Sequence, residues 1–397
     1  MTKITRPRRL RKFRRQFQVI GALIVVALLV VGVQVGVRMN QQGENLPTAA
    51  AEVLRDDGFS PVVAMAENIY YGYINPAKVG GDPTSGAVFG GADSSGGSKK
   101  VAYVAPKANV QAWGPAMLPS VVPAKLVSPV SPRPHEGEWI PTKIKVNGVT
   151  AVYVARVRPD AIHTSVYAAI AWFDPKLLAF SQIPGTQLPE GNVPSRGNGR
   201  VPPKLRPFYM AGFAAGYKMD QSQGGYVNQG FTTKPLVDGK ATLLTYPDGS
   251  IRIADWGRDN VPTNFVTARQ NLSLMVDHGV SQVTSEDQAK WGQVWYGTGS
   301  GHNYIWRSGI GIRADGSVVY VQSAALSAGT LADLLVKAGA VVGMALDMNQ
   351  AFANGDFYGP YRPSAMPINP ENKLPANKFW KRSSRDFVAV FAKSPAQ

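Results

Sequence analysis

The longest apolar stretch of the chain begins at Phe17 and ends at Val37. Only Gln18 and Gln34 interrupt it, and both lie near its ends. As a helix with a rise of about 1.5 Å per residue it would span roughly 31 Å, which matches the hydrocarbon core of a bilayer. We therefore expect residues 17–37 to form a transmembrane helix in contact with membrane lipid.

A cleaved signal peptide is the alternative interpretation of this stretch. Signal peptides have a shorter apolar core, of about 7–15 residues, followed by small residues at the cleavage site. The sequence TAAAE at residues 48–52 is the candidate for a late cleavage site. The length of the apolar stretch favours an anchor that is retained.

After residue 135, short apolar runs alternate with turn residues, which is typical of strands joined by hairpins. The sequences NG at 147–148, PDG at 247–249 and ADG at 314–316 predict three tight turns. Strands are expected at residues 142–146, 151–157, 166–173, 208–213, 241–246, 250–254, 310–312 and 318–322, and a strand or mixed segment at 268–276.

One helix is predicted after the third of these turns. Thr330 can cap its N-terminus, and Asp333 then completes a capping box. The apolar face of this helix consists of Leu331, Leu334 and Leu335. Gly339 can adopt the left-handed conformation that ends a helix. The apolar run at residues 340–346 is then expected to be a buried strand.

These patterns predict a single α+β domain at residues 136–397, a mixed and sheet-rich fold with many hairpins and at least one strand–helix–strand unit. Residues 38–135 are expected to form a stalk, because residues 80–100 are rich in Gly and Ser and residues 119–134 contain five prolines. Short strands are expected within the stalk at residues 68–73 and 101–104.

The net charge of +16 comes from 42 Lys and Arg against 26 Asp and Glu. Nine of the basic residues precede residue 39, which leaves 33 for the rest of the chain and a net charge of +7 there. A basic flank before an apolar segment stays in the cytoplasm. We therefore expect residues 1–16 to be a cytoplasmic tail and the C-terminal domain to lie outside the cell membrane. Such a tail is expected to contact anionic lipid headgroups and not nucleic acid.

Several classes of site are excluded by what the sequence lacks. The chain has no cysteine, so it has no disulfides, thiolate metal sites or cysteine nucleophiles. The G-x-x-x-x-G-K-[ST], G-x-S-x-G, H-E-x-x-H and EF-hand motifs are also missing from the sequence. The candidate catalytic and ligand-binding residues must therefore be polar residues outside these motifs.

Asp347 and Asn349 directly follow the predicted buried strand at residues 340–346. In α/β sheets, ligands commonly bind at the carboxyl ends of strands. This position predicts a catalytic carboxylate at Asp347 and a substrate-binding amide at Asn349. The alternative is a turn that ends the strand, in which the Asp347 side chain accepts a backbone hydrogen bond.

Arg307 and His302 lie in the sequence GHNYIWRSGIGI, just before the predicted strand at residues 310–312. An arginine can hold a phosphate or carboxylate through two hydrogen bonds, although a structural salt bridge explains its presence equally well. His302 can act as a general acid or base because histidine titrates near neutral pH. The alternative for His302 is an ordinary surface position in a loop.

The segment GGYVNQGFTTKPL, which begins at residue 224, is rich in glycine. Gly225 and Gly230 would let the backbone approach a ligand closely. Asn228 between them could bind the hydroxyl groups of a carbohydrate. The alternative is an ordinary glycine-rich turn.

Taken together, these motifs resemble the phosphodiester glycosidase family, the family of the uncovering-enzyme catalytic domain. The matching segments are MAGF at 210–213, the glycine-rich segment 224–230 with DG at 238–239, RSGIGI at 307–312 with DG at 315–316, and residues 330–349. The sequences RPD at 158–160 and RQNL at 269–272 are similar to a bacterial, actinobacterial-type branch of the family.

The resemblance implies an enzyme that hydrolyses a sugar-1-phosphodiester in envelope glycans. It implies that Arg307 binds the phosphodiester and that Asp347 is the catalytic carboxylate or holds a divalent cation. Better-studied members carry N-L-D-G-G-G-S-S where this chain has ALDMNQAF at residues 345–352, so the aspartate is retained and the glycine loop is not. A non-catalytic glycan-binding or envelope-scaffold protein on the same fold is therefore the alternative function.

Overall fold

The computed structural model describes residues 26, 28–40, 45–83, 122–284, 288–291, 304–361 and 365–393. The chain divides into two compact units, Met1–Ala66 and Glu67–Gln397. The expected tail, residues 17–25 and 27 of the expected span, the expected strand at 101–104 and His302 all lie outside the described residues. Within the described ranges, no helix combines the length and apolar character needed to cross a membrane.

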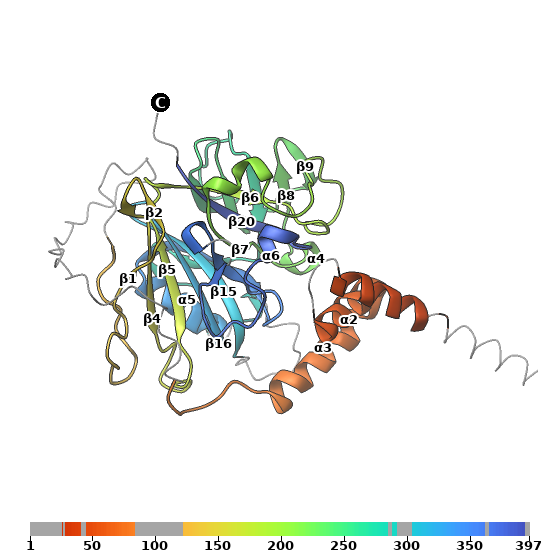
Figure 1. Ribbon diagram of the computed structural model, residues 1–397, viewed down its shortest axis with the longest axis horizontal. Helices are drawn as coiled ribbons and strands as arrows, with labels where there is room; N and C mark the ends of the chain where they lie inside the picture. Colours follow the sequence, from red (N-terminus) through yellow and green to blue (C-terminus); the bar gives the residue numbers. More distant parts are fainter. Residues whose placement is uncertain are drawn as a thin grey trace, which may run out of the picture. The chain divides into compact units, whose positions relative to one another are not determined.

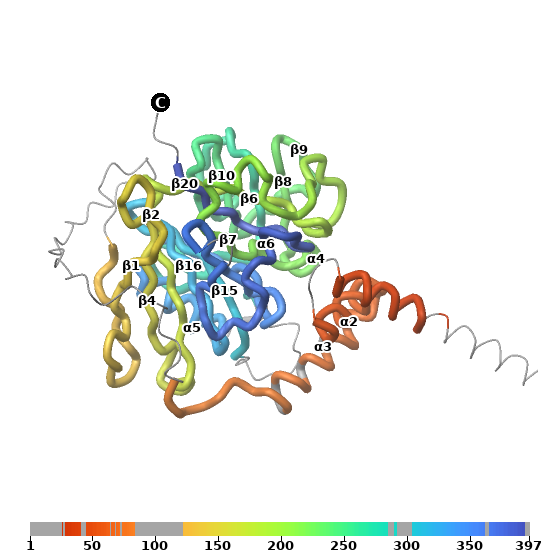
Figure 2. Tube along the Cα trace, viewed as in Figure 1, coloured from red at the N-terminus to blue at the C-terminus, as the bar shows by residue number. Residues whose placement is uncertain are grey.

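Helices dominate the described residues between 45 and 74 (Figures 1 and 2). Asn45 caps the helix α2 (Leu46–Leu54) by accepting a 3.0 Å hydrogen bond from the Thr48 amide. A π-helical turn, η1 (Arg55–Phe59), leads into α3 (Ser60–Ile69), and a second one, η2 (Tyr70–Ile74), follows it. The expected strand at residues 68–73 is therefore wrong. Its tyrosines favour strands, but the segment continues the preceding helix.

Three sheets form the unit Glu67–Gln397, and every strand pair within its described residues is antiparallel. The largest contains, in spatial order, β1 (Ile140–Pro141), β4 (Val152–Val157), β5 (Ala168–Phe173), β16 (Val318–Leu326), β15 (Ile305–Arg313), β17 (Ala340–Met348), β13 (Leu274–Asp277) and β14 (Val280–Ser281). The second contains β11 (Ile251–Asp255), β10 (Ala241–Thr245), β12 (Thr267–Gln270), β8 (Tyr226–Asn228) and β9 (Phe231–Lys234). The third contains β19 (Met366–Pro367), β18 (Gly355–Phe357), β7 (Tyr209–Ala214), β20 (Phe387–Ala392) and β6 (Leu178–Ile183).

Short helices and one separate hairpin complete this unit. The hairpin pairs β2 (Lys145–Val146) with β3 (Val149–Thr150). The helices are η3 (Pro203–Phe208), α4 (Met219–Ser222), η4 (Gln288–Trp291), α5 (Ala328–Lys337), η6 (Gly359–Tyr361) and α6 (Lys378–Lys381). The fold is thus sheet-rich α+β with few helices, as expected from the sequence.

The eight-stranded sheet is covered on both of its faces. One face packs against α5, as Figure 1 shows, in a core that joins Leu331 and Leu335 to Val319 and Val321. The opposite face shares a second core with strands of the two smaller sheets, for example with Val388 of β20. Because both faces are buried, the central strand β5 is buried at all six positions.

The predicted strand–helix–strand unit is present as β16, α5 and β17. The predicted cap at Thr330 is wrong, because Ser327 is the N-cap and Thr330 is the third residue of the helix. Ser327 accepts a 3.1 Å hydrogen bond from the Thr330 amide, and Thr330 Oγ1 accepts one of 2.8 Å from the Ser327 amide. Gly339 ends the helix region with a φ of 88°, as expected.

All three predicted turns join hairpin strands. Positive φ angles occur at Asn147, Gly148, Gly249 and Gly316, where the left-handed region favours these residue types. The segment expected at residues 268–276 as a strand or a mixed segment is not one strand, because it contains parts of β12 and β13, which belong to different sheets.

Described residues that precede Glu136 also belong to the compact unit. Leu126 is buried, and its amide donates a 2.9 Å hydrogen bond to the Gly137 carbonyl. Glu136 itself is buried against Arg158, with a 2.8 Å ion pair between them. The unit therefore begins earlier in the sequence than the domain boundary expected at residue 136.

Candidate functional site

Asp347 lies at the end of β17 and Arg307 lies near the start of the neighbouring strand β15. Arg307 pairs with Met348, the residue after Asp347, in the antiparallel register. The two candidate residues therefore lie on adjacent strands, at one end of the paired region of β15 and β17. The argument from the carboxyl ends of α/β strands was wrong, because the described sheet is antiparallel. The proximity follows instead from β15 running directly beside β17.

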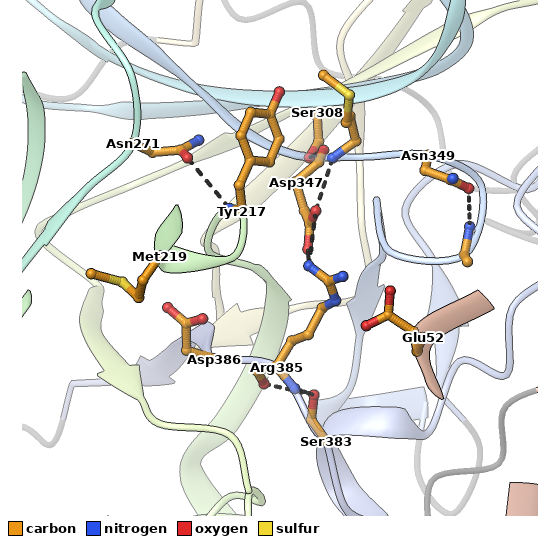
Figure 3. Close-up of polar contacts among 12 residues, drawn as sticks. Glu52, Tyr217, Met219, Asn271, Ser308, Asp347, Asn349, Ser383, Arg385 and Asp386 are labelled. Carbon is orange, nitrogen blue, oxygen red and sulfur yellow. Dashed lines mark hydrogen bonds and ion pairs between the residues drawn. The ribbon is translucent and has the colours of Figure 1, made fainter. Parts of the chain in front are cut away.

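Asp347 is a buried carboxylate with two partners (Figure 3). Its Oδ2 forms a 3.1 Å ion pair with Nη1 of Arg385, and its Oδ1 accepts a 3.1 Å hydrogen bond from the Met348 amide. Burial raises the pKa of Asp347 to about 6, while Arg385 opposes the shift and the nearby carboxylate of Asp386 adds to it. A carboxyl group with this pKa can exchange protons near neutral pH.

Arg307 is almost fully buried, with 1% of its surface exposed. Its Nε donates to the Leu326 carbonyl at 2.9 Å, and its Nη1 donates to the Trp291 carbonyl at 3.2 Å. These bonds orient the guanidinium group within the core. Burial raises the pKa of the neighbouring Tyr217 phenol, and the charge of Arg307 opposes that rise.

Tyr217 is the third member of this polar centre. Burial raises the pKa of its phenol, and the charge of Asp347 acts in the same direction, which places the phenol near both Asp347 and Arg307. Its backbone is held on both sides, because its amide donates to Oδ1 of Asn271 at 3.3 Å and its carbonyl accepts from Arg269. Figure 3 shows Tyr217 and Asp347 side by side.

A second buried ion pair involves Asp386, the residue that follows Arg385 in the sequence. Nε of Arg269 lies 3.0 Å from Oδ2 of Asp386, and both side chains are at most 1% exposed. Arg385 and Asp386 are consecutive residues, so the two ion pairs diverge from one point of the chain, just before β20. We define Asp347, Arg307, Tyr217 and Arg385 as the acid–arginine centre.

Sequence reasoning missed Tyr217, Arg385 and Asp386 as members of the site. The available signal was the polar run SSRD at residues 383–386, placed directly before the apolar strand FVAVFA. Two charged residues at the entry of a buried strand are unusual enough to mark a candidate. The sequence indicates Arg269 only through its place in the RQNL segment at residues 269–272.

Asn349 lies two residues beyond Asp347 but is engaged in a turn of its own. Its Oδ1 accepts hydrogen bonds from the Tyr71 hydroxyl at 2.8 Å and the Ala351 amide at 3.1 Å. Its Nδ2 donates to Oε1 of Glu67 at 3.0 Å. The Asn349 side chain thus already has three partners, and a substrate would compete with Tyr71 and Glu67 for its amide.

Asn349 also has a left-handed backbone, with a φ of 75°. Replacing it by alanine or glycine removes the same side-chain hydrogen bonds, but only alanine is strained in this conformation. We expect N349A to be less stable than N349G by about 1 kcal/mol, measured by urea unfolding. Equal stabilities would contradict a strained backbone at this position.

The glycine-rich candidates lie in the second sheet, away from β15 and β17 in the strand order. Asn228 ends β8 and donates to the hydroxyl of Ser195. Gly230 has a φ of 77° in the β8–β9 turn, with open space around it. Gly225 packs its backbone against that of Pro235. The described geometry therefore places Asp347 and Arg307 on adjacent strands of one sheet, and these three residues in or beside strands of another.

Replacing Gly225 and Gly230 by alanine should reduce the stability of the protein by different amounts. A Cβ at Gly225 would lie 2.0 Å from the Pro235 carbonyl oxygen, so the backbone of one segment must move. We expect G225A to destabilise the protein by about 1–3 kcal/mol, and G230A by about 1 kcal/mol, from its left-handed backbone alone. Urea unfolding compares the two. A larger loss for G230A would contradict the close packing at Gly225.

The surroundings of Asp347 do not fit a divalent cation. One carboxylate oxygen is paired with Arg385, and a cation beside this guanidinium group would be repelled. Among the described residues, no group of three or more His, Asp or Glu side chains could hold a metal ion. We therefore derive no step of a reaction through a metal at Asp347.

Comparison with known proteins gave matches at the level of structure only. No protein-family model and no curated protein sequence matches the chain. The catalytic domain of zebrafish N-acetylglucosamine-1-phosphodiester alpha-N-acetylglucosaminidase, auto-inhibited by its pro-peptide, has a TM-score of 0.42 and 13% identity over 68% of this chain and 87% of its own. A hypothetical protein from Synechocystis has a TM-score of 0.41 and 12% identity over 62% of this chain and 63% of its own. These likenesses are distant, and they carry no argument about function.

Proposed function

We propose that this chain is a hydrolase of sugar-1-phosphodiesters in envelope glycans, with residues 17–37 as its membrane anchor and its C-terminal domain outside the cell. The proposal joins the family resemblance of the sequence motifs to the chemistry of the acid–arginine centre. The observation that carries it is the buried Asp347, with a pKa raised to about 6, beside two arginines and a tyrosine.

The reaction adds water across the bond between C1 of the sugar and the phosphate oxygen. Ionised Asp347 accepts a proton from the attacking water, and its negative charge also stabilises the oxocarbenium-like transition state. The C1–O bond breaks, and its electron pair leaves with the phosphate monoester. Arg307 and Arg385 stabilise the charge of that leaving group.

Access to the centre requires some movement of its surroundings. Asp347 is 2% exposed and Arg307 is 1% exposed, so a substrate reaches them only when neighbouring groups are displaced. Closing such a site after binding would exclude water other than the nucleophile and strengthen the electrostatic interactions within it.

The test is release of free sugar from a sugar-1-phosphodiester by the purified full chain in detergent, followed by NMR. Because ionised Asp347 is the active form and its pKa is about 6, the rate should rise as pH increases through 6. At saturating substrate we expect about a tenfold lower rate at pH 5 than at pH 7. A rate that falls over this range would contradict the role of Asp347 as base.

A non-catalytic glycan-binding protein is the second candidate, and two observations favour it. The glycine loop of the better-studied glycosidases is replaced here by MNQAF after Asp347. The centre is also nearly closed to solvent. Binding of a sugar-phosphate glycan without any product over prolonged incubation would support this candidate over the enzyme.

A further inference from the structure

Two basic segments, residues 199–208 and residues 378–382, come together on one side of the unit. The Val201 amide donates to the Phe379 carbonyl at 3.2 Å, and Nη2 of Arg206 donates to the Trp380 carbonyl at 3.0 Å. The second segment is α6 with Arg382, and α6 is labelled in Figure 1. We call the surface formed by these two segments the basic surface.

The basic surface carries positive charge that nearby acids do not neutralise. The two segments contain six basic residues and no acidic one, namely Arg200, Lys204, Arg206, Lys378, Lys381 and Arg382. In the part of the chain that the structure describes, no ion pair involves Arg200, Lys204, Lys381 or Arg382. Burial lowers the pKa of Arg206, and the charge of Arg200 lowers it further. Arg206 therefore experiences another cation close by.

Apolar groups lie among these cations. Leu205 is 44% exposed and Phe208 is 46% exposed. The guanidinium carbon of Arg206 lies 4.7 Å from the centre of the Trp380 ring, so the ring is held in place. An exposed aromatic ring between cations, here that of Phe208, suits a ligand that alternates negative groups with sugar rings, because sugars pack their C–H faces on aromatic rings.

The basic surface lies close to the acid–arginine centre along the chain. Only two residues separate Arg382 from Arg385, so their Cα atoms lie within about 11 Å of each other. The charge of Lys378, in α6, lowers the pKa of Asp347. A chain-like ligand with one unit at Asp347 could therefore extend its following units over the basic surface.

We infer that the basic surface binds a linear polyanion in which sugar units are joined by phosphodiesters, and that it holds this polymer while one linkage occupies the acid–arginine centre. This inference rests on the proposed function, since it names the substrate of the same site as a polymer. An anionic lipid surface carries the same negative charge as this polymer and is the alternative ligand. The polymer is favoured because the cations extend toward Asp347 and only two large apolar side chains among them are well exposed.

The experiment measures binding of the full chain in detergent to long-chain inorganic polyphosphate, without turnover. The patch variant carries R200Q, K204Q, K381Q and R382Q. The matched control loses four exposed lysines elsewhere, through K78Q, K143Q, K145Q and K176Q. The basic residues near the N-terminus are the same in both proteins, so their contribution cancels in the comparison.

We expect the patch variant to bind polyphosphate at least about tenfold more weakly than the control, with a shallower dependence on salt. Both variants should hydrolyse a small sugar-1-phosphodiester at the wild-type rate. Equal polyphosphate binding by the two variants would overturn the inference. Binding of both variants to vesicles of anionic phospholipid is measured in parallel, and a loss of binding confined to these vesicles would also overturn it. Absence of hydrolysis by every protein would contradict the proposed function instead, because polyphosphate binding is measured independently of it.

Discussion

Replacing Asp347 by asparagine should reduce the release of sugar from a sugar-1-phosphodiester by about 10²–10⁴-fold, the usual contribution of a positioned acid or base. The amide cannot accept a proton from water, and it carries no charge to stabilise the transition state. Asparagine has nearly the same shape and can still accept the hydrogen bond from the Met348 amide. The change also leaves the buried Arg385 without its charged partner, so the variant should lose stability as well, and its turnover is measured where it remains folded.

The matched control for this variant is D333N. Asp333 is also a carboxylate whose pKa is raised by burial, but it lies on α5 and is exposed to solvent. D333N should retain wild-type turnover. Circular dichroism of both variants checks that the fold is preserved. Unchanged turnover in D347N would remove Asp347 from the mechanism, whatever the behaviour of D333N.

The parts of the fold that could be predicted depend on short-range signals. The turn at Asn147 and Gly148 needs positive φ angles, and these two residue types favour them whatever surrounds the turn. The buried strand that becomes β17 could also be recognised, because an apolar run between a helix and a polar residue has few other interpretations. Such local signals identify individual turns and strands, but they do not show which of these lie beside one another in the fold.

The errors arise where the tertiary structure decides between local alternatives. Ser327 and Thr330 both suit a helix N-terminus, and they form one capping box, so the sequence alone allowed the wrong member to be taken as the cap. The segment 268–276 changes sheet at Leu272, whose φ is 60°. Nothing in the local pattern of apolar residues marks that change of direction.

The acid–arginine centre could be predicted only in part for the same reason. Asp347 and Arg307 were found because each stands beside a strand that the sequence reveals. Arg385 lies 38 residues after Asp347 in the sequence. Their ion pair depends on the position of β20, the strand of the third sheet that begins just after Arg385. Tyr217 follows β7 in a segment without regular structure, and it is positioned by Arg269 of β12 and by Asn271, which directly follows that strand. Long-range contacts of this kind leave no periodic pattern.

Replacing Arg269 by methionine should destabilise the unit by about 3–5 kcal/mol, because the change leaves a buried charge without its partner. Both side chains of the Arg269–Asp386 pair are at most 1% exposed. Methionine fills much of the arginine volume, so the loss reflects charge and hydrogen bonds more than a cavity. The variant also frees the Tyr217 carbonyl, which Arg269 holds.

The comparison variant is R258M. Arg258 pairs with Asp277 at 2.6 Å and with Asp259 at 2.8 Å, but its side chain is 46% exposed. Water screens such pairs, so its loss should cost less than about 1 kcal/mol. Urea unfolding of the two variants therefore separates a buried ion pair from an exposed one.

A second change tests whether the uncompensated carboxylate causes the loss. Adding D386L to R269M removes the buried charge that the first variant leaves behind, and it should restore a substantial part of the stability. If R269M were no less stable than R258M, the pair would not support the fold. If D386L restored nothing, the loss would come from the hydrogen bonds of Arg269 to backbone carbonyls, among them that of Tyr217.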